Sequence, residues 1–291
     1  MDENKLNNQG RRDFLRKLAI LPVAGVCLQA GEAEASRREY VKLIDTTKCI
    51  GCHRCTSACD RWNDLPAERT RVLTGKTFTV VNYRRLKSNG EAGVHVKWQC
   101  QHCRKPACAR VCPVNAISRL PEGPVVVVED KCIGCRYCYQ ACPFSVPELD
   151  FDERVTRKCH LCYNRFTGLE YRGKRYGGRA QPACVSNCPA GALDFGERSD
   201  MLKKAKARTK EVNGYLYGLS EAGGTGVLTI LPAEPEELGM IAAPKKKLLD
   251  NMDSFRITMT GIAFAATMSG LMYFYSIMTE SEDDDDEQEH K

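Results

Sequence analysis

The sequence predicts an α+β fold of two interleaved modules, in which loops outnumber helices and strands. Three observations lead to this prediction: seventeen cysteines are spread over 291 residues, short apolar strands separate groups of cysteines, and helical patterning is rare. At 43% hydrophobic and 27% charged residues, the composition is that of a folded chain rather than a disordered one. Cysteine at this density indicates disulfides, single metal ions or metal clusters.

Sixteen of the cysteines fall into four sets of four along the chain. Gaps of two to four residues separate neighbours within a set, except for one gap of twenty-one residues in the fourth set. Gaps of two let one tight loop place three thiolates around a cubane, while the trailing cysteine points toward a neighbouring cubane. The spacing therefore predicts four [4Fe–4S] clusters with these sixteen cysteines as iron ligands. The sets are Cys49, Cys52, Cys55 and Cys59; Cys100, Cys103, Cys108 and Cys112; Cys132, Cys135, Cys138 and Cys142; Cys159, Cys162, Cys184 and Cys188.

The third set carries the most specific motif, because it matches the run of a bacterial ferredoxin without departure. Proline follows the last cysteine of the second, third and fourth sets, which suits a chain that must turn rather than continue a helix. In the first set Asp60 takes that place, so its motif is slightly weaker. Gly51 and Gly134 are expected where the loop passes closest to a cluster.

Ferredoxin runs of this kind exchange their trailing cysteines in pairs. We expect exchange between sets two and three, and between sets one and four across the chain. The predicted ligand groups are Cys49, Cys52, Cys55 and Cys188; Cys159, Cys162, Cys184 and Cys59; Cys100, Cys103, Cys108 and Cys142; Cys132, Cys135, Cys138 and Cys112. The predicted domains are a signal peptide (1–35), an outer ferredoxin-like module (36–97 and 150–200), an inserted ferredoxin-like module (98–149), a C-terminal extension (201–255), a transmembrane helix (256–279) and an acidic tail (280–291).

Two other cysteine chemistries fit parts of this pattern. Residues 49–53 have the form of a haem c attachment site, C-x-x-C-H. However, Cys55 and Cys59 complete a quartet, and the same Cys-Ile-Gly-Cys pattern recurs at 132–135 with Arg136 in place of histidine. Zinc or disulfides suit paired C-x2-C units, but neither explains repeated three-cysteine runs with a trailing Cys-Pro.

Two histidines lie inside C-x2-C turns, namely His102 and His160. A ring N–H at such a position can bond a cluster sulfur and tune its potential, and plain packing is the alternative. The basic, glycine-rich insertion 172–179 in the fourth set predicts a surface loop, which either touches a partner or is only solvated. Short strands are predicted at 41–44, 77–82, 125–128 and 226–231, and a helix at 199–209.

The N-terminus has the features of a twin-arginine export signal. Arg11 and Arg12 precede a Phe-Leu-basic run, and the uncharged stretch 18–30 is too short to span a bilayer. Residues 33–35 then form a small-x-small cleavage site. A short buried helix is the alternative. Cys27, the seventeenth cysteine, lies in this segment and would be removed with it.

Near the other end, residues 257–279 carry no charge. At about 1.5 Å rise per residue this stretch can cross the roughly 30 Å hydrocarbon layer, and a buried soluble helix is the alternative. Lysines 245–247 precede the stretch and the acidic tail follows it, so the positive-inside rule would leave the main body in the cytoplasm. We give priority to the export signal, which places the body outside. Residues 36–279 carry a net charge of +13, which suits an acidic partner surface, anionic lipid or ordinary solvation.

Several segments together resemble one family. They are Arg11, Arg12 and Phe14, and residues 130–138, 141–144, 188–192 and 223–228. With these segments, an interrupted fourth set and one late apolar span, the chain resembles the four-cluster subunits of membrane-bound periplasmic oxidoreductases over nearly its whole length. It looks most similar to the HybA-type iron–sulfur subunit of hydrogenase-2 type nickel–iron hydrogenases. It is also similar to the beta subunit of formate dehydrogenase-N, which usually lacks its own twin-arginine signal.

The resemblance implies an electron-transfer subunit with no catalytic site of its own. Its partners would be a nickel–iron hydrogenase catalytic subunit and a quinone-reactive integral membrane subunit, with the C-terminal helix in the lipid bilayer at the periplasmic face of the bacterial cytoplasmic membrane. The same role in a formate dehydrogenase or other molybdopterin oxidoreductase is the alternative. A membrane-anchored interaction protein built on zinc or disulfides is a third hypothesis. No motif indicates binding to nucleic acid.

Overall fold

The computed structural model describes residues 38–68, 70–174, 180–240 and 267–272. The predicted signal peptide, the acidic tail and most of the predicted transmembrane segment lie outside these residues. The part of that segment that is described, 267–272, is helical. Within the described ranges, no helix has both the length and the apolar character needed to cross a membrane.

Four strands from distant parts of the sequence form one sheet with the order β8-β1-β10-β9. Strand β1 (Tyr40–Asp45) runs parallel to β10 (Val227–Leu231) and antiparallel to β8 (Leu193–Glu197). Strand β9 (Tyr215–Tyr217) completes the sheet antiparallel to β10. The parallel pairing of β1 with β10 closes the body, because it joins the start of the described residues to a strand almost 190 positions later.

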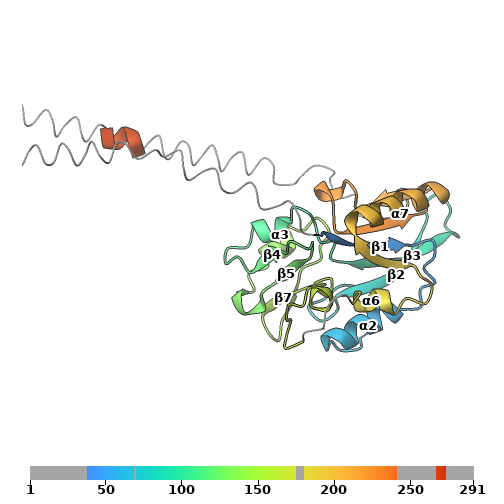
Figure 1. Cartoon of the computed structure of the whole chain (residues 1–291), viewed down its shortest axis with the longest axis horizontal. Coiled ribbons are helices and arrows are strands. Elements are labelled where there is room, and N and C mark those ends of the chain that lie inside the picture. Colours follow the sequence, from blue (N-terminus) through green and yellow to red (C-terminus); the bar gives the residue numbers. More distant parts are fainter. Residues whose placement is uncertain (1–37, 69, 175–179, 241–266, 273–291) are drawn as a thin grey trace, which may run out of the picture. The chain divides into compact units, whose positions relative to one another are not determined.

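The two faces of this sheet have different roles, because alternate residues of a strand point to opposite sides. One face packs Val41, Leu43 and Leu228 against helix α7 (Arg198–Glu211), whose Ala205 is fully buried. The other face packs Ile44 and its neighbours against cysteines of the first and fourth sets. Figure 1 shows α7 lying over the sheet. The sheet therefore supports cysteine loops on one side and is covered by a helix on the other.

A second layer is the hairpin of β2 (Thr79–Arg85) and β3 (Gly93–Gln99), in which Val81 lies opposite Lys97. The inserted region adds two short hairpins. They are β4 (Ile117–Arg119) with β5 (Val125–Val127), and β6 (Glu148–Asp150) with β7 (Val155–Arg157). Six further elements are single helical turns: α3 (Ala107–Arg110), η2 (Glu129–Lys131), α4 (Tyr137–Gln140), α5 (Tyr163–Phe166), α6 (Ala183–Ser186) and η3 (Glu221–Gly223).

The residue that follows the trailing cysteine determines the length of the helix near the end of each cysteine run. Helices α3, α4 and α6 have four residues each, and one residue separates the end of each helix from its Cys-Pro step. Helix α2 (Arg54–Asn63) has ten residues and ends at Asp64 in the left-handed region. Proline cannot continue a helix, and Asp60 can. The missing proline of the first set therefore produces a longer helix rather than a weaker loop.

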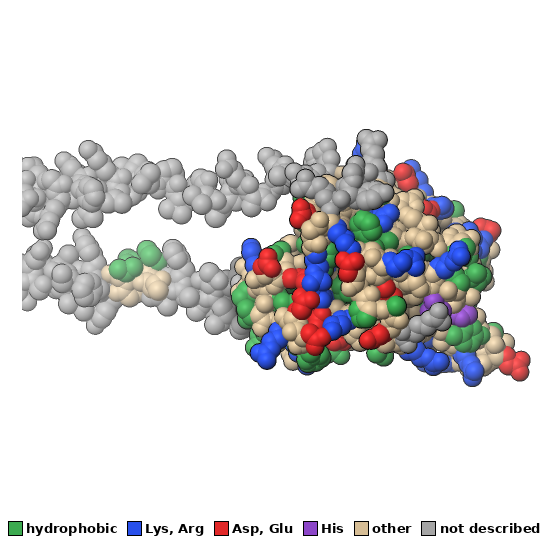
Figure 2. All heavy atoms as spheres, turned by 90° about the horizontal axis from the view of Figure 1, so that it is seen from below, with side chains coloured by type: hydrophobic (Ala, Val, Ile, Leu, Met, Phe, Trp, Pro, Cys, Tyr) green, Lys and Arg blue, Asp and Glu red, His purple; other side chains and the backbone are tan. Residues whose placement is uncertain are grey.

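The predicted strands and helix are confirmed by β1, β2, β5, β10 and α7, with small differences at their ends. Strands β9 and β10, which come from the predicted C-terminal extension, lie in the same sheet as β1. The mixed α and β character of the body is confirmed as well. Figure 2 shows acidic and basic side chains interspersed over one face, so the net positive charge is not gathered into one patch there.

Candidate iron–sulfur sites

The first and third cysteine runs adopt the same backbone turn. Gly51 and Gly134 have φ of 68° and 69°, and the residues two positions later, His53 and Arg136, have φ of 58° and 62°. A Cβ at Gly51 would lie 2.3 Å from the ring of His95, which would have to move, and the left-handed φ itself favours glycine. His53 thus occupies the same left-handed position as Arg136. The recurrence predicted from sequence is a recurrence of conformation, which favours a cluster loop over a haem attachment site.

The Cys-Pro steps also share one turn. The residue three positions after the trailing cysteine is left-handed in each case, with φ of 50° at Asn115, 50° at Ser145 and 59° at Gly191. Its N–H donates to the carbonyl of that cysteine in all three turns. In the second set, Ala116 N–H also donates to Cys112 Sγ at 3.2 Å. The backbone therefore turns back immediately after each trailing cysteine.

Four candidate sites follow from the predicted ligand groups, and we number them I to IV. Site I is Cys49, Cys52, Cys55 and Cys188; site II is Cys59, Cys159, Cys162 and Cys184; site III is Cys100, Cys103, Cys108 and Cys142; site IV is Cys112, Cys132, Cys135 and Cys138. The structure brings all four cysteines of site I to the wall of one pocket. That pocket places Cys188 of the fourth run beside the first run.

Sites II and III also collect cysteines from two runs each. Burial raises the pKa of Cys59, and the nearby sulfurs of Cys162, Cys159 and Cys184 add to this rise. Burial likewise raises the pKa of Cys103, and the sulfurs that add to this rise are those of the other site III cysteines: Cys100, Cys108 and Cys142. In both sites the trailing cysteine comes from the other run.

Site IV lies at the inserted hairpins. The nearby Cys132 and Cys135 sulfurs raise the pKa of Cys138, and Cys112 packs into the same apolar cluster as Cys138. Thr156 of β7 contacts two of these sulfurs: its N–H donates to Cys132 Sγ at 3.3 Å, and its Oγ1 lies 3.6 Å from Cys138 Sγ. Strand β7 therefore lines site IV.

The four sites follow one another in space. The Cys184 sulfur of site II raises the pKa of Cys55 of site I, so these two sulfurs lie near each other. In the same way, Cys159 of site II raises the pKa of Cys100 of site III. Lastly, Cys138 of site IV raises the pKa of Cys108 of site III, so neighbouring sites are close together along the whole row. One cysteine at each end of this row, Cys52 of site I and Cys135 of site IV, is exposed, while the cysteines of sites II and III are buried or half-buried.

Most of the buried thiols are in surroundings that disfavour a lone thiolate. Burial raises the pKa of Cys55 and Cys142 to about 11, and that of Cys108 and Cys162 to about 12. Cys184 is different, because Lys42 and Lys97 outweigh its burial and bring its pKa below the usual value. Thiolates in such surroundings need nearby positive charge, which ligated iron supplies.

The donor set fits cubane clusters better than the alternatives. All sixteen described cysteines are free thiols. Within the described ranges, no three Cys, His, Asp or Glu side chains converge as a single metal ion requires. Three lysines are buried near these sulfurs: Lys42, Lys97 and Lys158. Buried positive charges are stable only when negative charge lies close by. Iron–sulfur clusters with four thiolates carry such charge, so the residues present fit this group.

The two histidines of the cysteine turns are buried and neutral. His102 Nδ1 accepts a hydrogen bond from Val125 N–H at 2.9 Å, so its proton is on Nε2, which has no partner among the described residues. His160 is oriented by Asn63, with 2.7 Å between Nε2 and Oδ1. Burial lowers the pKa of His102 well below its usual value and that of His160 to about 3. The Nε2–H of His102 therefore stays available to a cluster, and a bond from it to a cluster sulfur stays a prediction.

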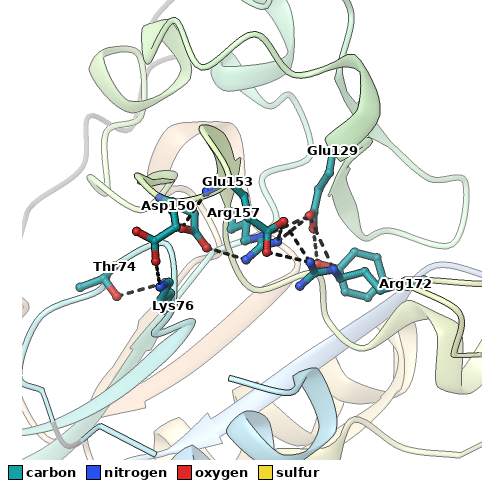
Figure 3. A network of polar contacts seen from close by, with 9 residues as sticks. Thr74, Lys76, Glu129, Asp150, Glu153, Arg157 and Arg172 are labelled. Carbon is teal, nitrogen blue, oxygen red and sulfur yellow. Dashed lines mark hydrogen bonds and ion pairs between the residues drawn. The ribbon is translucent and has the colours of Figure 1, made fainter. Parts of the chain in front are cut away.

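A polar network holds the loops around site IV (Figure 3). Arg157 is only 3% exposed at its side chain and pairs with Asp150 at 2.5 Å, with Glu129 at 3.0 Å and with Glu153. Tyr171 donates to Glu129 Oε1 at 2.6 Å. This ties the segment that leads into the predicted surface insertion to the turn η2, which leads into Cys132.

Sequence reasoning did not single out the buried lysines. Lys42 interrupts an apolar strand, Val-Lys-Leu-Ile, and a lone lysine at an inward position is the signal that would have drawn attention to it. Lys97 and Lys158 give no comparable signal in the sequence.

Spacing, geometry and donor chemistry together define an iron–sulfur protein of the double-cluster kind. Two family models agree: each is described as a 4Fe-4S dicluster domain, and they match residues 34–117 and 92–198. Two such domains mean that the protein carries four [4Fe–4S] clusters, as predicted.

Three curated relatives indicate which kinds of oxidoreductase contain subunits similar to this protein. The iron–sulfur subunit of the nitrate-inducible formate dehydrogenase of Escherichia coli is 32% identical over 276 residues, which is 87% of this chain and 90% of that protein. A subunit of the sulfite dehydrogenase of Allochromatium vinosum is 34% identical over 225 residues, 70% of this chain and 90% of the relative. A subunit of the anaerobic dimethyl sulfoxide reductase of Escherichia coli is 36% identical over 171 residues, 57% of this chain and 77% of the relative.

With its two dicluster domains, this protein belongs to the family of iron–sulfur subunits of oxidoreductases. Subunits of this kind transfer electrons and leave catalysis to a partner. The predicted hydrogenase partner finds no support in these relatives, which are subunits of formate dehydrogenase, sulfite dehydrogenase and dimethyl sulfoxide reductase. They favour the alternative given with that prediction.

Proposed function

We propose that this protein conducts electrons between a molybdopterin-type catalytic subunit, such as that of a formate dehydrogenase, and a second redox subunit in the membrane. The observation that carries the proposal is the row of sites I, II, III and IV, joined by the sulfur pairs Cys55 with Cys184, Cys100 with Cys159, and Cys108 with Cys138. A row of this kind is what stepwise electron transfer between two partners needs.

The same proposal assigns the ligands as sites I to IV define them, with trailing cysteines exchanged between runs. One-electron transfer is the chemistry that [4Fe–4S] clusters supply when bound. The protein's own residues hold the iron through sixteen thiolates and keep water from the inner sites through the buried cysteines of sites II and III. At the two ends, Cys52 and Cys135 are exposed, which supports electron exchange with partners there.

We further propose that the protein works at the periplasmic face of the cytoplasmic membrane. Support comes from the twin-arginine pattern around Arg11 and Arg12, the uncharged stretch 257–279 and the helical state of residues 267–272. Protease added to intact spheroplasts is expected to degrade the main body and spare the C-terminal tail. A body that is protected until the cells are lysed would contradict this location.

Purification of the native complex through a tag on this protein tests the partner. We expect about sixteen iron atoms per polypeptide and a co-purifying subunit that contains molybdenum. A catalytic partner that contains nickel instead would restore the hydrogenase prediction and overturn this one. A polypeptide that binds zinc in place of iron would overturn the electron-transfer role altogether.

A further inference from the structure

Three lysine ammonium groups are buried among the candidate sites. Lys42, Lys97 and Lys158 are 0%, 2% and 4% exposed. Lysine is almost never buried this far without a partner of opposite charge. Every Lys–carboxylate pair among the described residues belongs to another lysine, so none of these three has an Asp or Glu partner there.

Lys42 is directed at site II by the strand that carries it. Its Nζ donates to Cys184 Sγ at 3.1 Å and to Gln99 Oε1 at 3.2 Å. The flanking Val41 and Leu43 point to the opposite face, where they pack near α7. The Cys159 and Cys162 sulfurs of the same site are also close enough to interact electrostatically with Lys42. Strand β1 therefore places one positively charged side chain at site II.

Gln99 joins two of the buried lysines. Its Oε1 accepts from Lys42 and also from Lys97, whose Nζ donates to Thr79 Oγ1 as well. Two ammonium groups that share one neutral oxygen repel each other. Their approach is favourable only if negative charge lies close by, and Lys97 lines the pocket that holds the cysteines of site I.

Lys158 holds the corresponding place at site III. Its Nζ donates to the Val125 carbonyl and to the Cys159 carbonyl, the latter at 3.3 Å. Val125 packs in the same apolar cluster as Cys108 of site III. The positive charge of Lys158 also lowers the pKa of Cys100, Cys108 and Cys142, three of the four cysteines of site III, against the effect of burial. Both of its carbonyl partners are neutral, so its charge is not cancelled by them.

A cluster gains one negative charge on reduction, and a fixed cation nearby stabilises the reduced form more than the oxidised form. Burial strengthens this effect, because the local dielectric is low. We propose that Lys42 and Lys158 are positioning cations that raise the reduction potentials of the clusters at sites II and III, respectively. The proposal rests on the ligand groups given under the proposed function. Each electron arrives from the neighbouring site and leaves to the next, so no further reductant or proton enters the step.

The surroundings of Lys42 support a fixed charge. Its Nζ contacts Cys184 Sγ and Gln99 Oε1, and the Cys159 and Cys162 sulfurs belong to the same site. The other charged or titratable groups near it among the described residues are Lys97, Lys158 and the neutral histidines of the cysteine turns, and none of them is acidic.

The test is a redox titration of the purified complex, followed by electron paramagnetic resonance, with iron content measured in parallel. In Lys42→Met, we expect one inner cluster to become harder to reduce by at least tenfold in its equilibrium constant, which is about 59 mV for a one-electron couple. Lys158→Met should shift a different cluster. Lys42→Arg keeps the charge and should restore most of the potential. Lys204→Met is the matched control, because Lys204 is an exposed lysine that pairs with Asp194 at the surface.

The outcomes separate this inference from the proposed function. If the unsubstituted protein contains no iron and gives no cluster signals, the proposed ligands are wrong. If Lys42→Met keeps all its iron and all four potentials are unchanged, the role of Lys42 is refuted. It is equally refuted if Lys42→Arg shifts the potential as far as Lys42→Met does. Should Lys42→Met lose a cluster, Lys42→Gln, which keeps a polar contact to Gln99, decides between the same two results.

Discussion

His160 Nε2 donates to Asn63 Oδ1 at 2.7 Å, across 97 residues of sequence. The same Asn63 side chain donates through Nδ2 to the Cys59 carbonyl at 2.8 Å and lies 3.5 Å from Cys59 Sγ. One amide therefore holds the trailing cysteine of the first run against the turn of the fourth run. This contact exists because α2 continues past Cys59 far enough to present Asn63.

Asn63→Leu is expected to destabilise the protein by about 1–3 kcal/mol, because the buried His160 N–H then has no acceptor. Anaerobic chemical denaturation followed by circular dichroism measures this change. Asn89→Leu, at an exposed position, is the control and should stay within about 0.5 kcal/mol of the unsubstituted protein. Equal stability of the two variants would mean that the Asn63 contact contributes nothing.

Exchange of the trailing cysteines predicts which variants should behave alike. Cys188→Ser is expected to alter the same cluster signal as Cys52→Ser, because both residues line the site I pocket. Cys184→Ser, only four residues before Cys188, should alter a different cluster. Electron paramagnetic resonance of the three reduced variants gives the comparison. If Cys188→Ser instead matches Cys184→Ser, the fourth run keeps its own cysteine and the exchange is wrong.

Asp60→Pro would restore the Cys-Pro step that the other three sets have, and the motif alone predicts that it is harmless. The structure predicts the reverse. Asp60 lies inside α2, where proline removes a helix hydrogen bond and clashes with the preceding turn, at a cost of about 3 kcal/mol. Asp60→Ala is the control that keeps the helix. Thermal or chemical unfolding of the two variants distinguishes the predictions, and a Pro variant as stable as the Ala variant would favour the motif.

The cysteine spacing predicts candidate ligands because cluster ligation is mostly local. Three thiolates of each run must fit within one short loop, so their separation in sequence reflects their separation in space. The apolar strands β1 and β10 were predicted for a similar reason, since buried strands appear as short apolar runs. Their pairing with each other was not predicted, because nothing local in either strand specifies a partner that far along the sequence.

The buried cations escaped prediction for the same physical reason. A lysine in a sequence of ordinary charge content is by default solvated, and only tertiary contacts show which ones are not. Lys42 is identified by Gln99 and Cys184, and Lys158 by Val125 and Cys159. The hairpin β6–β7 was also missed, because its strands are three residues long and carry mostly polar side chains.

Arg157 gives the last prediction, which concerns pH. Arg157 and then Arg172 donate hydrogen bonds to Glu153, and these bonds lower the pKa of that carboxyl group (Figure 3). A group whose pKa is lower in the folded state adds stability above its unfolded pKa of about 4.3, and this contribution is lost as the pH falls through the folded pKa. Glu153 is about half exposed, so the contribution should be under about 1 kcal/mol.

Glu153→Gln should therefore be less stable than the unsubstituted protein at pH 7, and the gap should close as the pH falls below about 4. Urea denaturation at several pH values measures the gap, and Glu170→Gln, at an exposed position, is the control. Arg157→Met should cost more, about 3–5 kcal/mol, because it leaves the fully buried carboxylate of Asp150 without its cation. A pH-independent gap for Glu153→Gln would show that packing, rather than charge, holds the loops around site IV.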